Sequence, residues 1–254
     1  MEKRINGLII NDGIVVGVED INNITEAIIP NGVTSIGKGA FLGCESLTSV
    51  SIPYGVTSIG DHAFGCTGLT SISIPNSITS IGDWAFAYCK SLTNINIPDT
   101  VISIGDHAFL DCTGLISIDI PDSVTSINNH TFSGCIGLTS ISIPNSVTSI
   151  GYRAFYDCKA LISIDIPNSV TSIDDWAFGH CKGLKSVNIH NGITSIGNSA
   201  FWHCTGLTNI DIPDSVTSIG NWAFSDCTGL TSVNISNSTT SISKYAFDGC
   251  INLK

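Results

Sequence analysis

Basic residues are scarce in this chain. Lysine and arginine together number 10 among 254 residues, against 21 aspartate and glutamate residues, and the net charge is −11. The basic residues are scattered singly along the sequence, so they form no positive stripe that could follow a phosphate backbone or an anionic lipid surface. We therefore expect neither nucleic acid nor an anionic membrane as a partner.

Long apolar runs are absent as well. A membrane-spanning helix needs about 18 consecutive apolar residues, and no stretch of this chain comes close, so we expect no membrane insertion. The first residues, MEKRING, contain no apolar segment of the kind found in signal peptides. An internal location, export by another route and loss of a leader all remain open.

Motifs of catalysis and cofactor binding are missing. The chain has no glycine-rich phosphate loop and no C-x-x-C pair of the kind that binds zinc. Serine is abundant, but no base is placed to activate it. The neighbours Asp61-His62 and Asp106-His107 arise from repetition of one unit and not from a catalytic arrangement. We expect no enzymatic activity and no cofactor.

Metal binding has one weak candidate arrangement. His107 and His130 occupy matching positions in adjacent units, as do His180 and His203, so each pair would lie about 5 Å apart. Two histidines with an aspartate nearby would hold a transition-metal ion only weakly. We expect no dedicated metal site.

What the chain does have is repetition. Its phenylalanines recur every 23 residues, except for one step of 22 between Phe64 and Phe86, and a leucine stands three residues after each of the 10 cysteines. Self-similarity at a period of this length is typical of solenoids. The repeating phenylalanines are Phe41, Phe64, Phe86, Phe109, Phe132, Phe155, Phe178, Phe201, Phe224 and Phe247.

One unit, residues 76–98, reads NSITSIGDWAFAYCKSLTNINIP. Its Leu92–Ile97 stretch alternates apolar and polar residues as a strand does, and Pro98 ends that strand because proline has no N–H to donate. A second extended piece precedes Gly82, and the spacing from Trp84 to Cys89 predicts one helical or 3₁₀ turn. Only a stack of units could bury the inward-facing set, which is Ile78, Ile81, Ala85, Phe86, Cys89, Leu92, Ile95, Ile97 and Pro98.

The fuller pattern I-P-x-x-V-T-S-I-G-x-x-A-F-x-x-C-x-x-L resembles the BspA-like leucine-rich repeats, a subclass known from surface proteins of bacteria and unicellular parasites. The resemblance implies a solenoid with a parallel β-sheet on its concave face, and with short extended pieces and single helical or 3₁₀ turns on the other side. It also implies a cell-surface location and a protein partner such as a host or matrix protein. The Asn or Cys of common leucine-rich repeats is replaced here by residues such as Ser77 and Thr100, so other groups must satisfy the backbone of that turn.

The chain divides into a cap and a solenoid. Residues 1–25 lie outside the repeat, and Ile5–Ile10 and Ile14–Val18 flank a turn signal at Asn11-Asp12-Gly13, so we expect an N-terminal β-hairpin that covers the first unit. Residues 26–254 form ten units, one of them of 22 residues, with no C-terminal cap. We expect the uncovered strand edge at that end to permit self-association.

The cysteines are expected to be reduced. Matching cysteines in neighbouring units would lie about 5 Å apart, but their Cβ atoms would point in parallel, whereas a disulfide needs Cβ atoms that converge to about 3.8 Å. Buried free cysteine is a small apolar residue that packs well. We therefore predict structural thiols rather than a disulfide framework.

Large amphipathic side chains gather beside the Ala-Phe pair of each unit. Projecting from one edge of a rigid scaffold, they would make a recognition stripe; the alternative is that they only shield the turns and pack on each other. The small polar residues of the sheet face include none of the usual binding anchors. The candidate partner-binding residues are His62, Trp84, His107, His130, Arg153, Trp176, Trp202, Trp222 and Tyr245.

Two functions follow from this pattern. The first is a protein–protein interaction or adhesion module that presents a rigid repeat surface to a protein partner. The second is a structural spacer or assembly scaffold without a specific ligand. Exposed stripe side chains would favour the first, and a fully packed stripe would favour the second.

Overall fold

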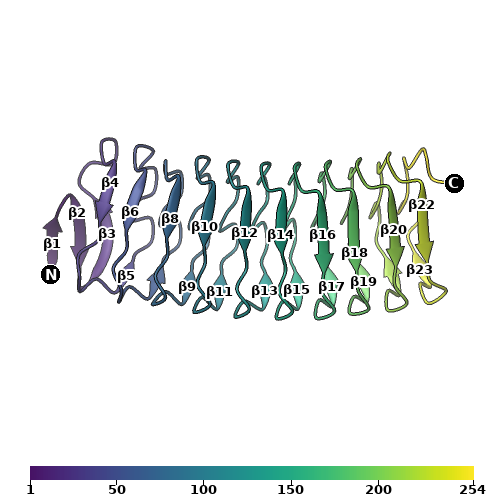
Figure 1. Ribbon diagram of the computed structural model, residues 1–254, viewed down its shortest axis with the longest axis horizontal. Helices are drawn as coiled ribbons and strands as arrows, with labels where there is room; N and C mark the ends of the chain where they lie inside the picture. Colours follow the sequence, from purple (N-terminus) through teal and green to yellow (C-terminus); the bar gives the residue numbers. More distant parts are fainter.

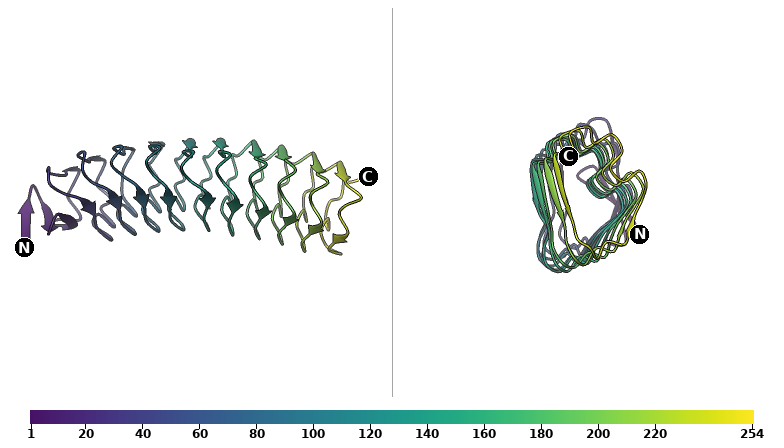
Figure 2. Two further views of the ribbon diagram at one scale, coloured as in Figure 1. Left: turned by 90° about the horizontal axis from the view of Figure 1, so that it is seen from below. Right: turned by 90° about the vertical axis from the view of Figure 1, so that its right-hand side faces the viewer.

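The computed structural model describes residues 1–254 as a stack of similar coils along one long axis (Figure 1). Seen along that axis, the coils superimpose in outline, and from the side the stack bends into a shallow arc (Figure 2). Each residue therefore lies beside its equivalents one unit earlier and one unit later. The predicted solenoid is confirmed. All regular elements are strands, and no helix is present that could cross a membrane.

The first strand of each repeat is the one predicted after the leucine. In most of these strands the middle apolar residue is buried and the polar residues on either side are exposed, and paired strands lie in parallel register, with Ile95 beside Ile72. These strands pair two by two. They are β4 (Glu26–Ile28), β6 (Ser49–Ser51), β8 (Ser71–Ser73), β10 (Asn94–Asn96), β12 (Ser117–Asp119), β14 (Ser140–Ser142), β16 (Ser163–Ile166), β18 (Ser186–Ile189), β20 (Asn209–Ile212) and β22 (Ser232–Ile235).

The second extended piece makes the longer sheets. It contributes two-residue strands that join into a seven-stranded sheet, which includes the cap, and a six-stranded sheet, with a break between β11 and β13. These strands are β5 (Ser35–Ile36), β7 (Ser58–Ile59), β9 (Ser80–Ile81), β11 (Ser103–Ile104), β13 (Ser126–Ile127), β15 (Ser149–Ile150), β17 (Ser172–Ile173), β19 (Ser195–Ile196), β21 (Ser218–Ile219) and β23 (Ser241–Ile242).

A glycine follows most of these short strands because the coils approach closely there. A Cβ atom on Gly82 would lie 2.7 Å from the backbone nitrogen of Asp61 in the preceding repeat. The N–H of Gly82 donates a hydrogen bond to the carbonyl of Ile59 at 2.8 Å, so the close approach extends the ladder by one rung. A side chain at this position would push two repeats apart.

The cap contains three antiparallel strands, β1 (Glu2–Ile5), β2 (Leu8–Asn11) and β3 (Ile14–Val18). The predicted hairpin is confirmed as β2 and β3. Strand β3 also pairs in parallel with β5. Strand β1 is additional, because Asn6-Gly7 forms a second turn like Asp12-Gly13. Both residues of each turn have positive φ, as two-residue hairpin turns require.

The core is one cluster of 72 buried residues that runs through the stack. Every member of the predicted inward-facing set is buried. The phenylalanine rings form a continuous column, with neighbouring centroids 5.1–5.6 Å apart and ring planes within 14° of parallel. A single repeat would leave these rings exposed, so the stack is the unit of stability.

The segment around each phenylalanine is not helical, which corrects the predicted helical or 3₁₀ turn. Trp84 and Tyr88 have positive φ, and the N–H groups of Trp84, Phe86 and Tyr88 donate to carbonyls one repeat later at 2.9, 2.8 and 2.7 Å. The N–H groups of Ala87 and Cys89 instead donate to carbonyls three residues earlier in the same repeat. A helix would keep all these bonds inside one repeat, whereas this conformation makes a further line of bonds between repeats.

The cysteines are free and form a hydrogen-bonded ladder. From Cys89 to Cys250, each thiol donates to the carbonyl of the phenylalanine one repeat earlier, at 3.0–3.2 Å. The replaced turn position is satisfied separately, since the Thr100 hydroxyl donates to the carbonyl of Ile78 at 2.7 Å. Side chains on both sides of the coil therefore tie each repeat to the one before it.

The 22-residue unit changes the cysteine column. Thr67 is buried, donates to the Phe64 carbonyl at 2.8 Å and contacts the Cys89 sulfur at 3.2 Å. It therefore occupies the place that a cysteine holds in other repeats. Cys66 is half-buried with positive φ, and so matches Tyr88. The sequence-based placement of Cys66 in the buried column is wrong.

Candidate functional site

The predicted stripe follows two columns of residues that run along the stack. The first column contains the residue before each Ala-Phe pair: Gly39, His62, Trp84, His107, His130, Arg153, Trp176, Ser199, Trp222 and Tyr245. The second column, two residues after each phenylalanine, contains Gly43, Cys66, Tyr88, Asp111, Gly134, Asp157, His180, His203, Asp226 and Gly249. We call both columns, together with Trp202 beside them, the stripe.

The stripe backbone is left-handed at nearly every repeat. First-column residues from Gly39 to Trp222 have φ between 53° and 62°, and all second-column residues have positive φ. This conformation aims the N–H along the stack, as the bond from Trp84 to Asp106 shows. Left-handed φ suits glycine and costs a bulky L-residue about 1 kcal/mol or more. Tryptophan, histidine and arginine therefore carry a backbone cost at these positions that glycine would not carry.

Seven of the nine predicted site residues are brought into one continuous row. Ring centroids lie 5.6 Å apart between His62 and Trp84, 4.1 Å between Trp84 and His107, and 4.4 Å between His107 and His130. These rings are nearly parallel, so each covers the face of the next and presents its edge outward. The row continues through Arg153 and Trp176 to Trp202.

Trp222 and Tyr245 are not part of that row. Their rings stack on each other at 5.8 Å, and the small, buried Ser199 separates them from Trp176 in the first column. They are the most exposed predicted site residues, at 46% for Trp222 and 42% for Tyr245. The stripe therefore has a half-buried central row and a more exposed pair near the last repeats.

Arg153 lies among aromatic rings and has no acidic partner. Its Cζ atom is 5.1 Å from the ring centroid of Tyr152, 5.0 Å from Tyr156 and 5.4 Å from Trp176. Its Nε is buried without a hydrogen-bond partner. Tyr152, which was not predicted, replaces the Asp or Asn that precedes most first-column residues, and this departure was readable in the sequence.

A groove of about 380 Å³ lies along the central row. Its walls come from four consecutive repeats and include the edges of Trp84, His107 and His130, together with Arg153 and Tyr156. This volume is at the lower end for a small-molecule site and would hold one or two side chains of a partner. Asp111 and Asp157 also line the groove, and Asp157 pairs with Lys159 at 2.9 Å.

Burial favours the neutral form of three histidines of the stripe, His107, His130 and His180. The pKa of His130 is lowered to about 4 by burial and by the nearby His107 and Arg153. Burial also lowers the pKa of His107, against the opposing charges of Asp106 and Asp83. The pKa of His180 is lowered by burial and by His203.

The histidine pairs do not gather a third ligand. His107 and His130 stack face to face, and His180 and His203 lie 5.0 Å apart, but no group of three His, Cys, Asp or Glu side chains is arranged to hold a metal ion. Stacked rings present their faces to each other, whereas ligation uses nitrogen lone pairs in the ring plane.

A second histidine cluster lies away from the stripe. His190 Nε2 is 3.0 Å from Asp165 Oδ1, and Asn188 donates to the same oxygen at 2.7 Å. His190 stands where most repeats have proline, which was the visible signal in the sequence. No hydroxyl or thiol is hydrogen-bonded to this pair, so it has no nucleophile to activate.

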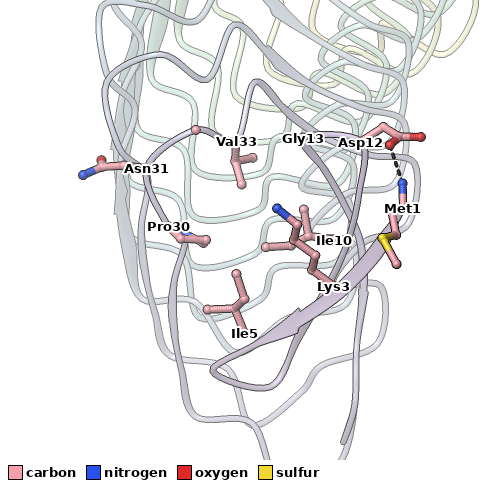
Figure 3. A pocket seen from close by; sticks show the side chains of 10 residues that line it. Met1, Lys3, Ile5, Ile10, Asp12, Gly13, Pro30, Asn31 and Val33 are labelled. Atoms are coloured by element: carbon pink, nitrogen blue, oxygen red, sulfur yellow. Dashed lines mark hydrogen bonds and ion pairs between the residues drawn. The ribbon is translucent and has the colours of Figure 1, made fainter.

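A pocket of about 340 Å³ lies at the cap end (Figure 3). Ile5, Ile10 and Val33 gather there, with the Lys3 side chain among them. The pocket is separate from the stripe, and its charged lining groups are Lys3 and the ion pair between the Met1 amino group and Asp12. The stripe remains the stronger candidate surface.

Comparison with known proteins finds repeat proteins that are similar to the chain. A sequence model described as "BspA type Leucine rich repeat region (6 copies)" matches residues 19–139 and 125–254. No curated protein matches the chain significantly in sequence.

Crystal structures of three bacterial leucine-rich-repeat proteins are similar to the chain. A leucine-rich cell surface protein from Faecalibacterium prausnitzii is 26% identical, with a TM-score of 0.58, over 100% of this chain and 93% of that one. The leucine-rich-repeat protein of T. pallidum is 27% identical, with a TM-score of 0.59, over 82% of this chain and 87% of that one. A leucine-rich-repeat protein from Eubacterium ventriosum is 26% identical, with a TM-score of 0.53, over 95% of this chain and 89% of that one.

Proposed function

Since the chain belongs to the BspA-type leucine-rich-repeat family, we propose that it is a protein–protein interaction or adhesion module whose stripe contacts a protein partner. The observation that carries this proposal is the retention of large side chains on a left-handed backbone. Glycine is free of that strain, so packing of the fold alone would be served by glycine at these positions. The Faecalibacterium prausnitzii relative is a leucine-rich cell surface protein, which supports adhesion as the setting.

The chemistry of the stripe also suits protein recognition. Trp, Tyr and Arg dominate the energetics of protein interfaces, and the stripe holds such residues on a scaffold whose repeats are fixed by backbone hydrogen bonds. A rigid surface loses little conformational entropy on binding. Catalysis lacks comparable support, because no nucleophile and base meet in the stripe and repeat families of this kind are usually non-catalytic.

The alternative function is a structural spacer or assembly scaffold. It is favoured by one observation: the central rings stack on each other at 4.1 and 4.4 Å and so cover part of the surface that a partner would use. In that case the stripe would act only as a shield over the turns.

A capture experiment separates the two functions. Wild-type chain, Trp222→Ser and Ile102→Ser are immobilised and exposed to the same extract, and the retained proteins are compared. Ile102 is a matched control, since it is apolar and 64% exposed but lies outside the stripe. A protein retained by wild type and Ile102→Ser but lost with Trp222→Ser supports the interaction module. Identical retention by all three chains supports the scaffold.

A further inference from the structure

The repeat that contains Arg153 departs from its neighbours in one compact region. Most repeats place Asp or Asn before the first-column residue, and this side chain accepts a hydrogen bond from the next repeat, as Asp83 does from the N–H of Asp106 at 2.8 Å. Tyr152 accepts no such bond, so the N–H of Asp175 turns to its neighbour Asp174 instead. The hydrogen bond that other repeats make at this position is therefore missing beside the aromatic rings of Tyr152, Tyr156 and Trp176.

The three aromatic rings surround the Arg153 guanidinium group without neutralising its charge. Three rings lie within 5.0–5.4 Å of the Arg153 Cζ atom, and no carboxylate lies within ion-pair distance of the side chain. No hydrogen bond satisfies its nitrogens, and Nε is buried without a partner. Because Nε is buried, a group from outside can meet the guanidinium only at its two terminal nitrogens, which have no partner within the protein.

The surrounding groove limits what that group can be. Asp157 is paired with Lys159 and His130 is neutral near pH 7 because of its lowered pKa, which leaves Arg153 as the unpaired cation among the groove residues. The stacked rings present edges rather than faces, so a flat ring has no platform on which to stack. A planar guanidinium fork matches a carboxylate in two parallel hydrogen bonds.

We propose that Arg153 is the anchor of the stripe and that it receives the carboxylate of an aspartate or glutamate side chain on the protein partner. The proposal rests on the stripe being the binding surface, and it adds the partner's chemistry at one position. The acidic chain as a whole repels an acidic partner at long range. That repulsion is screened beyond about 8 Å at physiological ionic strength, so the contact is local.

The test follows the Arg153 Nε–H resonance by NMR in the full-length chain at physiological ionic strength. The probes are a capped five-residue peptide with two glutamates, the same peptide with glutamines, and inorganic phosphate. We expect the glutamate peptide to shift this resonance in the millimolar range and the glutamine peptide to leave it unchanged. Arg153→Gln should weaken binding of the glutamate peptide about tenfold or more. Arg153→Lys should also weaken it, because lysine keeps the charge but not the fork.

Lys185→Gln is the matched control, since it removes one exposed positive charge outside the groove and should leave binding unchanged. Equal shifts with both peptides, no shift up to about 10 mM glutamate peptide, or a shift with phosphate alone would each overturn the carboxylate assignment. The capture experiment with Trp222→Ser does not use Arg153. A stripe that binds a partner while the peptides fail would therefore contradict this inference and leave the proposed function standing.

Discussion

The thiol of Cys158 donates a hydrogen bond to the backbone carbonyl of Phe132, 3.2 Å away and one repeat earlier. The same relationship recurs along the stack, so the cysteine column both fills the core and ties successive coils together. A donor that is nearly apolar suits this place, because it satisfies a buried carbonyl without bringing a strongly hydrated group into the core.

The cysteine ladder predicts which thiols react. Most cysteines are fully buried, and burial raises the pKa of Cys44 and Cys89 to about 11, so little thiolate forms near pH 7. Labelling of the native protein should reach Cys66 first, because it is half-buried outside the ladder, and then Cys250. Mass spectrometry after limited labelling identifies the sites, and unfolding without reductant should release all 10 thiols. Fast labelling of Cys158 in the native protein would contradict the ladder.

The phenylalanine column predicts a gradient of stability. Phe155 is fully buried between Phe132 and Phe178, whereas Phe247 is half-buried and stacks on Phe224 alone. We expect Phe155→Ala to lower the free energy of unfolding by about 3–5 kcal/mol and Phe247→Ala to lower it much less. Urea denaturation of both variants measures the difference. Equal losses would argue against a stack in which each repeat contacts only its neighbours.

The left-handed stripe predicts a stabilising substitution. Ser199 has a φ of 54° and is buried, and its side chain makes no hydrogen bond that would offset the strain. Ser199→Gly should therefore raise the free energy of unfolding by about 0.5–1 kcal/mol, because relief of the strain exceeds the entropic cost of glycine.

The control for this prediction is Ser195→Gly, in strand β19, where the backbone gives glycine no advantage and the substitution should destabilise. Denaturation midpoints of the two variants are compared with that of wild type. A loss of stability in Ser199→Gly equal to that in Ser195→Gly would mean that the left-handed backbone stores no strain.

His130 predicts a loss of stability in acid. Its pKa is about 4 in the folded chain and about 6.5 when unfolded, so the unfolded state binds the proton first as the pH falls. Stability should be complete above pH 6.5 and should decline from there to about pH 4. Burial lowers the pKa of His107 and His180 in the same direction.

The pH effect can be assigned with two variants. His130→Gln should flatten the fall in melting temperature between pH 6.5 and 4, whereas Ser199→Gly, which alters the stripe without removing a titratable group, should not. A slope unchanged by His130→Gln would mean that His130 is not held neutral by burial.

The repeat period predicted the inward-facing side chains well because equal spacing leaves few ways to stack units. Every buried residue named for the reference unit is buried in the structure. The period could not predict the backbone around Trp84, since its left-handed φ depends on bonds to the next repeat. It also misplaced Cys66, because the structure keeps Phe64 and Leu69 in register and fills the core with Thr67.

The candidate stripe was predictable as a set of positions but not as an arrangement. Spacing placed Trp84, His107 and His130 in one column, and the structure brings their rings into contact. A repeat pattern does not encode rotamers or burial. It therefore could not predict the interruption of the row at Ser199, the aromatic rings around Arg153 or the low pKa of His130. Tyr152 was visible as a departure from the Asp or Asn of other repeats, and such departures are a useful signal of specialised sites.

The most direct test of the account is to measure fold stability and partner capture on the same Trp222→Ser chain. Trp222 is 46% exposed and stacks only on Tyr245, and serine already occupies this column at Ser199. The account predicts a melting temperature close to that of wild type together with loss of the protein that wild type retains. A lowered melting temperature with unchanged capture would contradict it and would assign the stripe to packing.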